Sequence, residues 1–466
     1  MDPSEEIPRR SNLWLADRPE NEFSGLLFDQ ITTIFVIALA TFSFIVFWPL
    51  ISKIVFEEAF FTPLTPFLIG LLSIIGLEAN DTIRVLFIVS LMVSTVGIYL
   101  FVKELSKRQV TAILAAVIYL IPPVPIFVLT LIRRGLLEVE LASARSFFTI
   151  VYGDGAHFLG LALIPFAAIF FLRYLKMAAR SDLLATTVIS ALILLANRSQ
   201  ALNLLLIFTG LAITEFFLGV ARVKIRRFLL VLLFTLGLVS FWYTFSFWAE
   251  TLEIFNKEVV GNWRSLFPFP LIFTTLALFF SFVFFAKRQD RQPIFISFLL
   301  FVVFLVIIAD WLLNQRSFLP HPQRLLPTLI MFASMVSALT LTAVVDKLLV
   351  SFRFNPGSWS LSARSLAALV FGFLSFLIFA AGAFFLSPLV ILAVTGPFGI
   401  WSKIRLSVLA DREQTLRMAG ENFKLVKHDV GDWQSVFGVL VSLIFLGILL
   451  FWVFQRVLLE EKESAD

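Results

Sequence analysis

Residues Tyr152–Phe166 read YGDGAHFLGLALIPF, a glycine-flanked turn that runs directly into a long apolar stretch. The turn places an aspartate and a histidine, Asp154 and His157, at the entrance of a segment apolar enough to cross a bilayer. Ionisable groups are costly inside lipid and occur where a bundle interior or a watery cavity accommodates them. The stretch therefore predicts a membrane-spanning helix with polar groups of functional interest at its first turn.

The composition of the whole chain is that of an integral membrane protein. Hydrophobic residues make up 59% of the 466 residues, where soluble domains have about 45–50%. There are 56 phenylalanines and no cysteine, which excludes disulfides, thiolate nucleophiles and cysteine-bound metals. The net charge of +5 is explained by basic loop residues that set membrane topology, and we expect no nucleic-acid partner.

Apolar segments of the required length recur along the chain. A transmembrane helix needs about 20 apolar residues. The predicted spans are 31–51, 82–102, 109–129, 156–175, 183–197, 200–219, 227–247, 268–286, 293–313, 325–346, 365–390 and 435–455. Residues 63–77 are also apolar, but they are interpreted as a re-entrant or interfacial helix, because another span would turn the basic loops outward. More than half of the 37 lysines and arginines fall on the side that holds both termini, which predicts cytoplasmic ends.

The predicted fold is an all-α polytopic protein of about twelve transmembrane helices in the plasma membrane, surrounded by its lipids. A cytoplasmic segment, 1–30, precedes a seven-span module, 31–247, whose outer loops are 52–81 and 130–155. A five-span module, 248–466, carries the outer segment 391–434. The outer segments are the longer ones, so we expect functional groups to collect there.

Carboxylates, histidines and arginines are present on the predicted outer side. A carboxylate can act as a general base toward a hydroxyl group. A histidine or an arginine can hold a phosphate through charge-assisted hydrogen bonds. The candidate site residues are Glu57, Glu58, Arg133, Arg134, Asp154, His157, His321 and Arg324.

These candidates also have purely structural interpretations. Asp154 can cap the helix that follows it, with His157 at the third position of that helix. Glu57 and Glu58 can form a solvated loop pair, and Arg324 can extend to the lipid headgroups. The span interiors contain few ionisable groups, which argues against an ion-driven transporter.

Three stretches carry a resemblance to a known family. They are Phe61–Gly76 (FTPLTPFLIGLLSIIG) followed by YLFVKEL at Tyr99–Leu105, GDGAH at Gly153–His157 followed by LIPF and RYLK, and PQRLLP at Pro322–Pro327. In these stretches the chain resembles the GT-C superfamily of membrane glycosyltransferases, which use polyprenyl-phosphate sugars. It looks most similar to the prokaryotic group known as 6-pyruvoyl-tetrahydropterin synthase-related membrane proteins. The resemblance covers the first seven spans more fully than the later ones.

The resemblance implies a glycosyltransferase that moves a sugar from a polyprenyl-phosphate donor to a glycan, lipid or protein acceptor at the outer membrane face. The alternative is a non-catalytic protein on the same scaffold. Such a protein would be a flippase or transporter for lipid-linked glycans, or a subunit of a complex that assembles surface polymers, with further envelope-assembly partners.

Roles for the candidate residues follow from the same resemblance. Glu57 or Glu58 would deprotonate the acceptor hydroxyl, although catalytic members usually carry an aspartate in this loop. Asp154 and His157 would bind the acceptor or a divalent metal, Mg²⁺ or Mn²⁺. Arg324, with Arg133 or Arg134, would neutralise the leaving phosphate of the donor, and His321 would bind substrate.

Overall fold

The computed structural model describes residues 34–38, 40–41, 62–120, 155–198, 200–218, 221–255, 292–314, 325–351 and 433–465. Within these ranges the chain forms α-helices and no β-strand, which confirms the all-α prediction for the described part. Among the described residues, three helical segments are long and apolar enough to cross a membrane: Asp81–Ser106, His157–Met177 and Trp433–Gln455.

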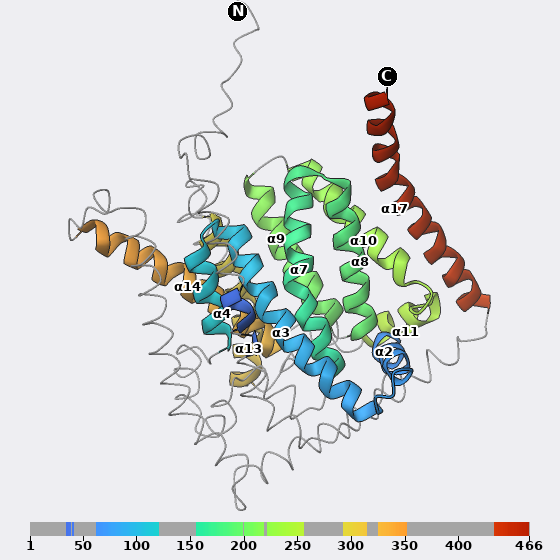
Figure 1. Ribbon diagram of the computed structural model, residues 1–466, viewed down its shortest axis with the longest axis horizontal. Coiled ribbons are helices and arrows are strands. Elements are labelled where there is room, and N and C mark those ends of the chain that lie inside the picture. Colours follow the sequence, from blue (N-terminus) through green and yellow to red (C-terminus); the bar gives the residue numbers. More distant parts are fainter. Residues whose placement is uncertain are drawn as a thin grey trace, which may run out of the picture.

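Figure 1 shows how the described helices are arranged. Their bounds are α2 (Leu64–Ser73), α3 (Ala79–Ser106), α4 (Gln109–Leu120), α7 (Gly155–Met177), α8 (Arg180–Ala196), α9 (Gln200–Leu218), α10 (Ala221–Val239), α11 (Phe245–Phe255), α13 (Gln292–Asn314), α14 (Leu326–Ser351) and α17 (Trp433–Ala465). The ten residues of α2 extend about 15 Å, half the hydrocarbon thickness, which suits a helix that does not span.

One expected span is broken in the structure. The segment predicted at 227–247 begins earlier, at Ala221, and its helix ends at Val239. The Ser240 hydroxyl donates to the Gly237 carbonyl at 2.8 Å, and the Phe241 N–H donates to the Ser442 hydroxyl at 3.0 Å. The prediction of one continuous helix was wrong because a serine of distant α17 satisfies the backbone where α10 stops.

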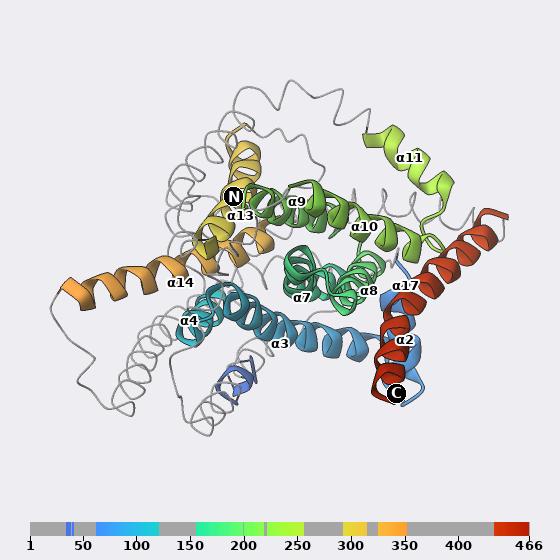
Figure 2. The ribbon, with the colours of Figure 1, turned by 90° about the horizontal axis from the view of Figure 1, so that it is seen from above.

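Helices α3 and α7 run side by side in the same direction. Near their first turns, Phe87 stacks on Phe158 with 4.7 Å between ring centroids. In their last turns, Arg173 of α7 donates to Glu104 of α3 at 2.7 Å. Contacts at both ends of the pair establish that the two helices are parallel. Seen from above, α7 and α8 lie between α3 on one side and α9 with α10 on the other (Figure 2).

Helix α9 runs parallel to α7 as well, and a buried carboxylate joins their last turns. The carboxylate of Glu215 in α9 accepts from Lys224 of α10 at 2.5 Å and from Gln292 of α13 at 2.7 Å. Lys176 of α7 lies 3.7 Å from the same carboxylate. Four helices therefore meet at one charged group.

The bundle thus has two chemically different ends. The charged end contains ionic and amide groups that bond between helices: Glu104, Arg173, Lys176, Glu215, Lys224 and Gln292. The opposite end, here the His157 end, holds the first turns of α3, α7 and α9 and the last turn of α8. The charged end carries helix termini predicted to be cytoplasmic, and the His157 end carries termini predicted to be outside.

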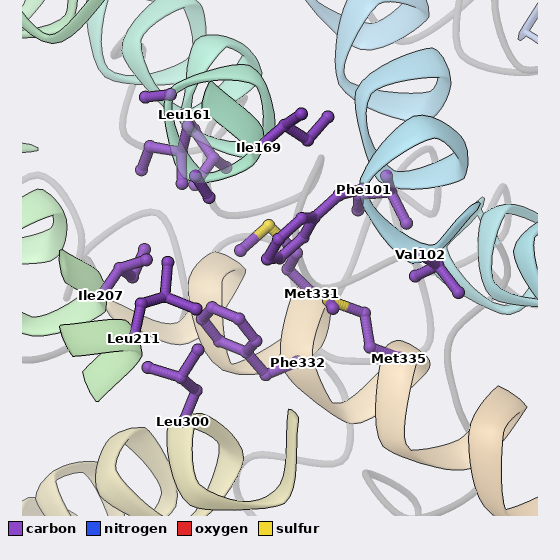
Figure 3. Packing of buried hydrophobic residues seen from close by; sticks show 14 of the residues in the cluster. Phe101, Val102, Leu161, Ile169, Ile207, Leu211, Leu300, Met331, Phe332 and Met335 are labelled. Atoms are coloured by element: carbon purple, nitrogen blue, oxygen red, sulfur yellow. The ribbon is translucent and has the colours of Figure 1, made fainter. Parts of the chain in front are cut away.

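Within the described residues, a large hydrophobic cluster lies between these ends, and a smaller one lies around Tyr243 and Phe247. Figure 3 shows side chains of α3, α7, α9, α13 and α14 pointing toward one another, with Phe101, Leu211 and Phe332 among them. Phe304 of α13 stacks on Phe332 of α14 at 5.6 Å. Helices from both predicted modules therefore share one core, as a single domain requires.

Helix α17 packs against α10 through small residues. A Cβ atom at Gly438 would collide with the backbone oxygen of Ser240, and one at Gly237 with the Phe445 ring. The hydroxyls of Ser240 and Ser442 are 3.0 Å apart in the same contact. Between Trp433 and Phe454, α17 exposes many large apolar side chains, a surface of the kind that faces lipid.

Candidate functional site at the His157 end

Only one of the eight predicted site residues, His157, lies in the described part of the chain. The others lie outside it, so their predicted convergence stays a prediction: Glu57, Glu58, Arg133, Arg134, Asp154, His321 and Arg324. Helix α7 begins at Gly155, directly after Asp154. His157 is therefore its third residue, as the capping interpretation expects.

The side chain of His157 is buried and is held by a glutamine of another helix. The Gln200 amide, at the first residue of α9, donates to the His157 carbonyl oxygen at 2.9 Å. The same Nε2 lies 3.1 Å from Nδ1 of the imidazole ring. Gln200 is itself fully buried, and its Oε1 accepts from Nδ2 of Asn203 at 2.7 Å. Three buried polar side chains therefore form a connected row across α7 and α9.

The hydrogen bonds in this row set the protonation pattern of the neutral imidazole. A carbonyl oxygen can only accept, so the bond to the His157 carbonyl fixes Nε2 of Gln200 as the donor. Nδ1 of His157 then accepts from that amide, and the ring proton resides on Nε2. His157 is thus arranged as a hydrogen-bond donor through Nε2.

This arrangement bears on the divalent metal that the sequence resemblance implies. A histidine binds a metal through a ring-nitrogen lone pair. Here the Nδ1 lone pair accepts from Gln200, and Nε2 carries the proton. His157 in this state does not fit a metal-ligand role. Within the described residues there is also no group of three or more His, Asp or Glu side chains suited to a metal ion.

Several buried polar atoms near this end have no hydrogen-bond partner within the described residues. One is Oδ1 of Asn203, at the end of the row that begins at His157. Others are the Thr65 hydroxyl of α2 and the indole N–H of Trp242. Buried polar groups are nearly always paired with protein or with water. Such atoms are therefore candidates to bond with water or with a polar ligand.

An aromatic cluster with an arginine lies beside the end of α8. The ring of Tyr243 lies 5.0 Å from that of Phe247 and 5.7 Å from that of Trp248, between centroids. Its hydroxyl donates to the Leu194 carbonyl at 2.7 Å. The Arg198 guanidinium sits 5.4 Å from the centre of the Phe247 ring, a cation–π contact. Flat apolar rings and a cation thus flank the turn between α8 and α9.

The N-terminal end of α2 is tied to the same turn. The Thr62 hydroxyl, just before α2, donates to the Ala196 carbonyl at 2.6 Å, and this bond is buried. Ala196 is the last residue of α8, and Gln200 opens α9 four residues later. Thr62 belongs to the first predicted outer loop, 52–81, so part of that loop reaches the region where His157 is held.

Sequence analysis singled out His157 but missed Gln200 and Asn203. The signal was present, because two amides three residues apart share one face at the start of an apolar helix. Polar side chains inside apolar spans face protein or a cavity rather than lipid. Screening spans for amides as well as charges would have found both residues.

The chain was compared with protein-family models, with curated proteins and with solved structures, and none of the three comparisons found a match. A function for this chain must therefore be inferred from its own residues.

Proposed function

We propose that the chain is a GT-C-type membrane glycosyltransferase. It transfers a sugar from a polyprenyl-phosphate donor to a glycan, lipid or protein acceptor at the outer face of the plasma membrane. The proposal includes twelve spans with both ends in the cytoplasm. The observation that carries it is the buried row of His157, Gln200 and Asn203 at one end of the bundle.

The chemistry of this row suits a sugar or a sugar phosphate. Sugar hydroxyls both donate and accept hydrogen bonds, and phosphate oxygens accept them. Nε2 of His157 is a donor, and Oδ1 of Asn203 is an acceptor without a partner in the described part of the chain. All three side chains can bind while uncharged, so they orient a substrate without holding a departing phosphate too tightly. In a buried site such bonds are stronger than in water.

The proposed reaction is a single displacement. Glu58 or Glu57 takes the proton of the acceptor hydroxyl, and the oxygen attacks the anomeric carbon of the donor. The bond from that carbon to the phosphate oxygen breaks, and polyprenyl phosphate leaves with the electron pair. Arg324, with Arg133 or Arg134, neutralises the phosphate. Attack opposite the leaving group inverts the anomeric centre.

The remaining roles are for binding. His157 donates to a donor or acceptor oxygen, Asp154 binds the acceptor, and His321 binds the donor. In GT-C-type chemistry a divalent metal would assist departure of the phosphate. Because the protonation state of His157 does not fit a metal ligand, no step here depends on a metal.

The two ends of the bundle support the proposed orientation. Membrane proteins concentrate basic residues in their cytoplasmic loops. Basic residues at the charged end include Lys107 and Arg108 between α3 and α4, Arg180 at the first residue of α8, and Lys224 and Arg227 in the first two turns of α10. The His157 end, where the reaction is proposed, then faces outward, toward the predicted long outer loops.

A non-catalytic scaffold protein is the second candidate. Gln200 is held by neutral groups of His157 and Asn203, an arrangement that binds a lipid-linked glycan equally well without cleaving it. The same three side chains would then serve a flippase or an assembly subunit. Binding is common to both candidates, and turnover separates them.

The test combines donor binding and turnover. Purified full-length protein in detergent is incubated with a panel of radiolabelled polyprenyl-phosphate hexoses and pentoses, and release of polyprenyl phosphate is followed with a membrane-lipid extract as acceptor. We expect turnover by the wild type, loss in Glu57→Gln/Glu58→Gln, and at least tenfold weaker donor binding in Gln200→Leu. Gln292→Leu, the same change at the charged end, is the matched control and keeps donor binding.

The outcomes separate the candidates. Donor binding by the wild type without turnover of any donor would reject the enzyme and support the scaffold protein. If the wild type and Gln200→Leu bind the donor equally well, the row of His157, Gln200 and Asn203 is not part of the donor site. The proposed function then loses the observation on which it rests.

A further inference from the structure

The start of α10 divides its basic residues between two faces. Lys224 and Arg227 point into the bundle, where they bond to Glu215 and to the carbonyls of Leu175 and Lys176. Arg222 and Arg226, four residues apart, lie on a different face. Both are exposed, and within the described residues neither forms an ion pair or hydrogen bond. Two positive charges are therefore presented away from the core.

A shallow, open hollow lies along α10, and both arginines are part of its lining. Its volume is about 270 Å³, and it is lined by Arg222, Ile225, Arg226, Leu229, Leu230 and Leu233. The lining positions follow helical spacing, so they form one stripe along α10 that is basic at its beginning and apolar beyond it. Leu229 and Leu233 are 55% and 53% exposed. The stripe is thus positively charged at its N-terminal end and apolar along the rest of its length.

The dimensions of the stripe match one leaflet of a bilayer. From Arg222 to Leu233 the helix rises about 16 Å, close to half of a ~30 Å hydrocarbon core. Arginines at the end of such a stripe lie at headgroup depth, and the leucines lie beside the acyl chains. The charge and the apolar length both correspond to a single anionic phospholipid.

We propose that Arg222 and Arg226 bind the phosphate of an anionic phospholipid of the leaflet at the charged end. Its acyl chain lies along Ile225, Leu229 and Leu233. The two guanidinium groups form charge-assisted hydrogen bonds to the phosphate oxygens. A zwitterionic lipid offers the same chain but carries a compensating cation, so it binds more weakly. This site is separate from the His157 end and does not depend on the proposed transferase activity.

The binding test uses native mass spectrometry of the full chain in detergent, titrated with dioleoyl phosphatidylglycerol or dioleoyl phosphatidylcholine. Each arginine near a phosphate strengthens binding about fivefold, so Arg222→Gln/Arg226→Gln should weaken phosphatidylglycerol binding by about 25-fold. Phosphatidylcholine binding should not change. Arg108→Gln, an arginine of the same predicted membrane side outside the stripe, should bind phosphatidylglycerol like the wild type.

Three results would overturn the proposal. One is unchanged phosphatidylglycerol affinity in the double variant, with circular dichroism showing that the variant is folded. A second is an equal loss in Arg108→Gln, which would indicate a general charge effect. A third is full displacement of phosphatidylglycerol by millimolar inorganic phosphate, which would show a site for the ion alone with no role for the leucines.

Discussion

Replacing Glu215 by leucine tests the charged end most directly. The carboxylate is 2% exposed and is bonded to Lys224, whose side chain is 14% exposed. Removing one partner of a buried ion pair costs about 3–5 kcal/mol, because the other charge is left without compensation. Lys224 also donates to the Glu215 backbone carbonyl at 2.9 Å, and that bond survives the substitution. We therefore expect Glu215→Leu to lower the free energy of unfolding by about 3 kcal/mol, the lower limit of that range.

The contribution of Lys176 to this cluster is small. It lies 3.7 Å from the carboxylate with a side chain that is 43% exposed, and exposed pairs contribute about 1 kcal/mol or less. A Glu215→Leu/Lys224→Met double variant removes both buried charges together. Since a buried pair replaced by apolar residues is often close to neutral, the double variant should be more stable than Glu215→Leu alone.

The measurement is reversible unfolding in mixed micelles, followed by circular dichroism, for both single variants and the double variant. Lys107→Met is the matched control. Lys107 pairs with Glu104 at 2.9 Å but is 72% exposed, so its loss should cost less than about 1 kcal/mol. A cost below about 1 kcal/mol for Glu215→Leu, or strict additivity in the double variant, would refute the reasoning from burial.

Three further substitutions probe other contacts. Gly438→Ala should lower the free energy of unfolding by about 1–3 kcal/mol, because the added Cβ meets the rigid backbone of Ser240. Gly447→Ala is the control: its added Cβ meets open space, so the free energy of unfolding should not change. Gly160→Ala places a Cβ 2.9 Å from the Gln200 side chain, so donor binding at the His157 end should weaken while circular dichroism stays unchanged. Arg173→Met should cost about 1 kcal/mol in chemical unfolding, because its partner Glu104 is partly exposed and keeps Lys107; a loss above about 3 kcal/mol would contradict this.

Much of the helical framework could be predicted from apolar segment length alone. The helix Gly155–Met177 departs by one or two residues from the predicted span 156–175, because the glycine turn and the basic RYLK stretch mark its ends. The break after Val239 could not be predicted, since it depends on Ser442, about two hundred residues later. Local sequence patterns contain no information on such a partner.

The candidate site was predictable only in part. An ionisable side chain at a span entrance drew attention to His157, whereas Gln200 and Asn203 carry no charge and belong to a helix that begins 43 residues later. Their importance follows from the packing of α9 beside α7, which a one-dimensional pattern does not specify. Glu57, Glu58 and the predicted arginines lie outside the described residues, so their roles stay predictions.

The Glu215 cluster also sets how α9 can tilt. Bonds to two other helices pin α9 near its last turn, while at its first residue Gln200 is held to α7 by two hydrogen bonds of about 3 Å. The distance along the helix from Glu215 to Gln200 is about 22 Å. A tilt of about 5° around that pivot displaces Gln200 by about 2 Å, which is enough to separate both bonds. A tilt of that size would therefore break the contact between Gln200 and His157 while leaving the bonds of Glu215 in place.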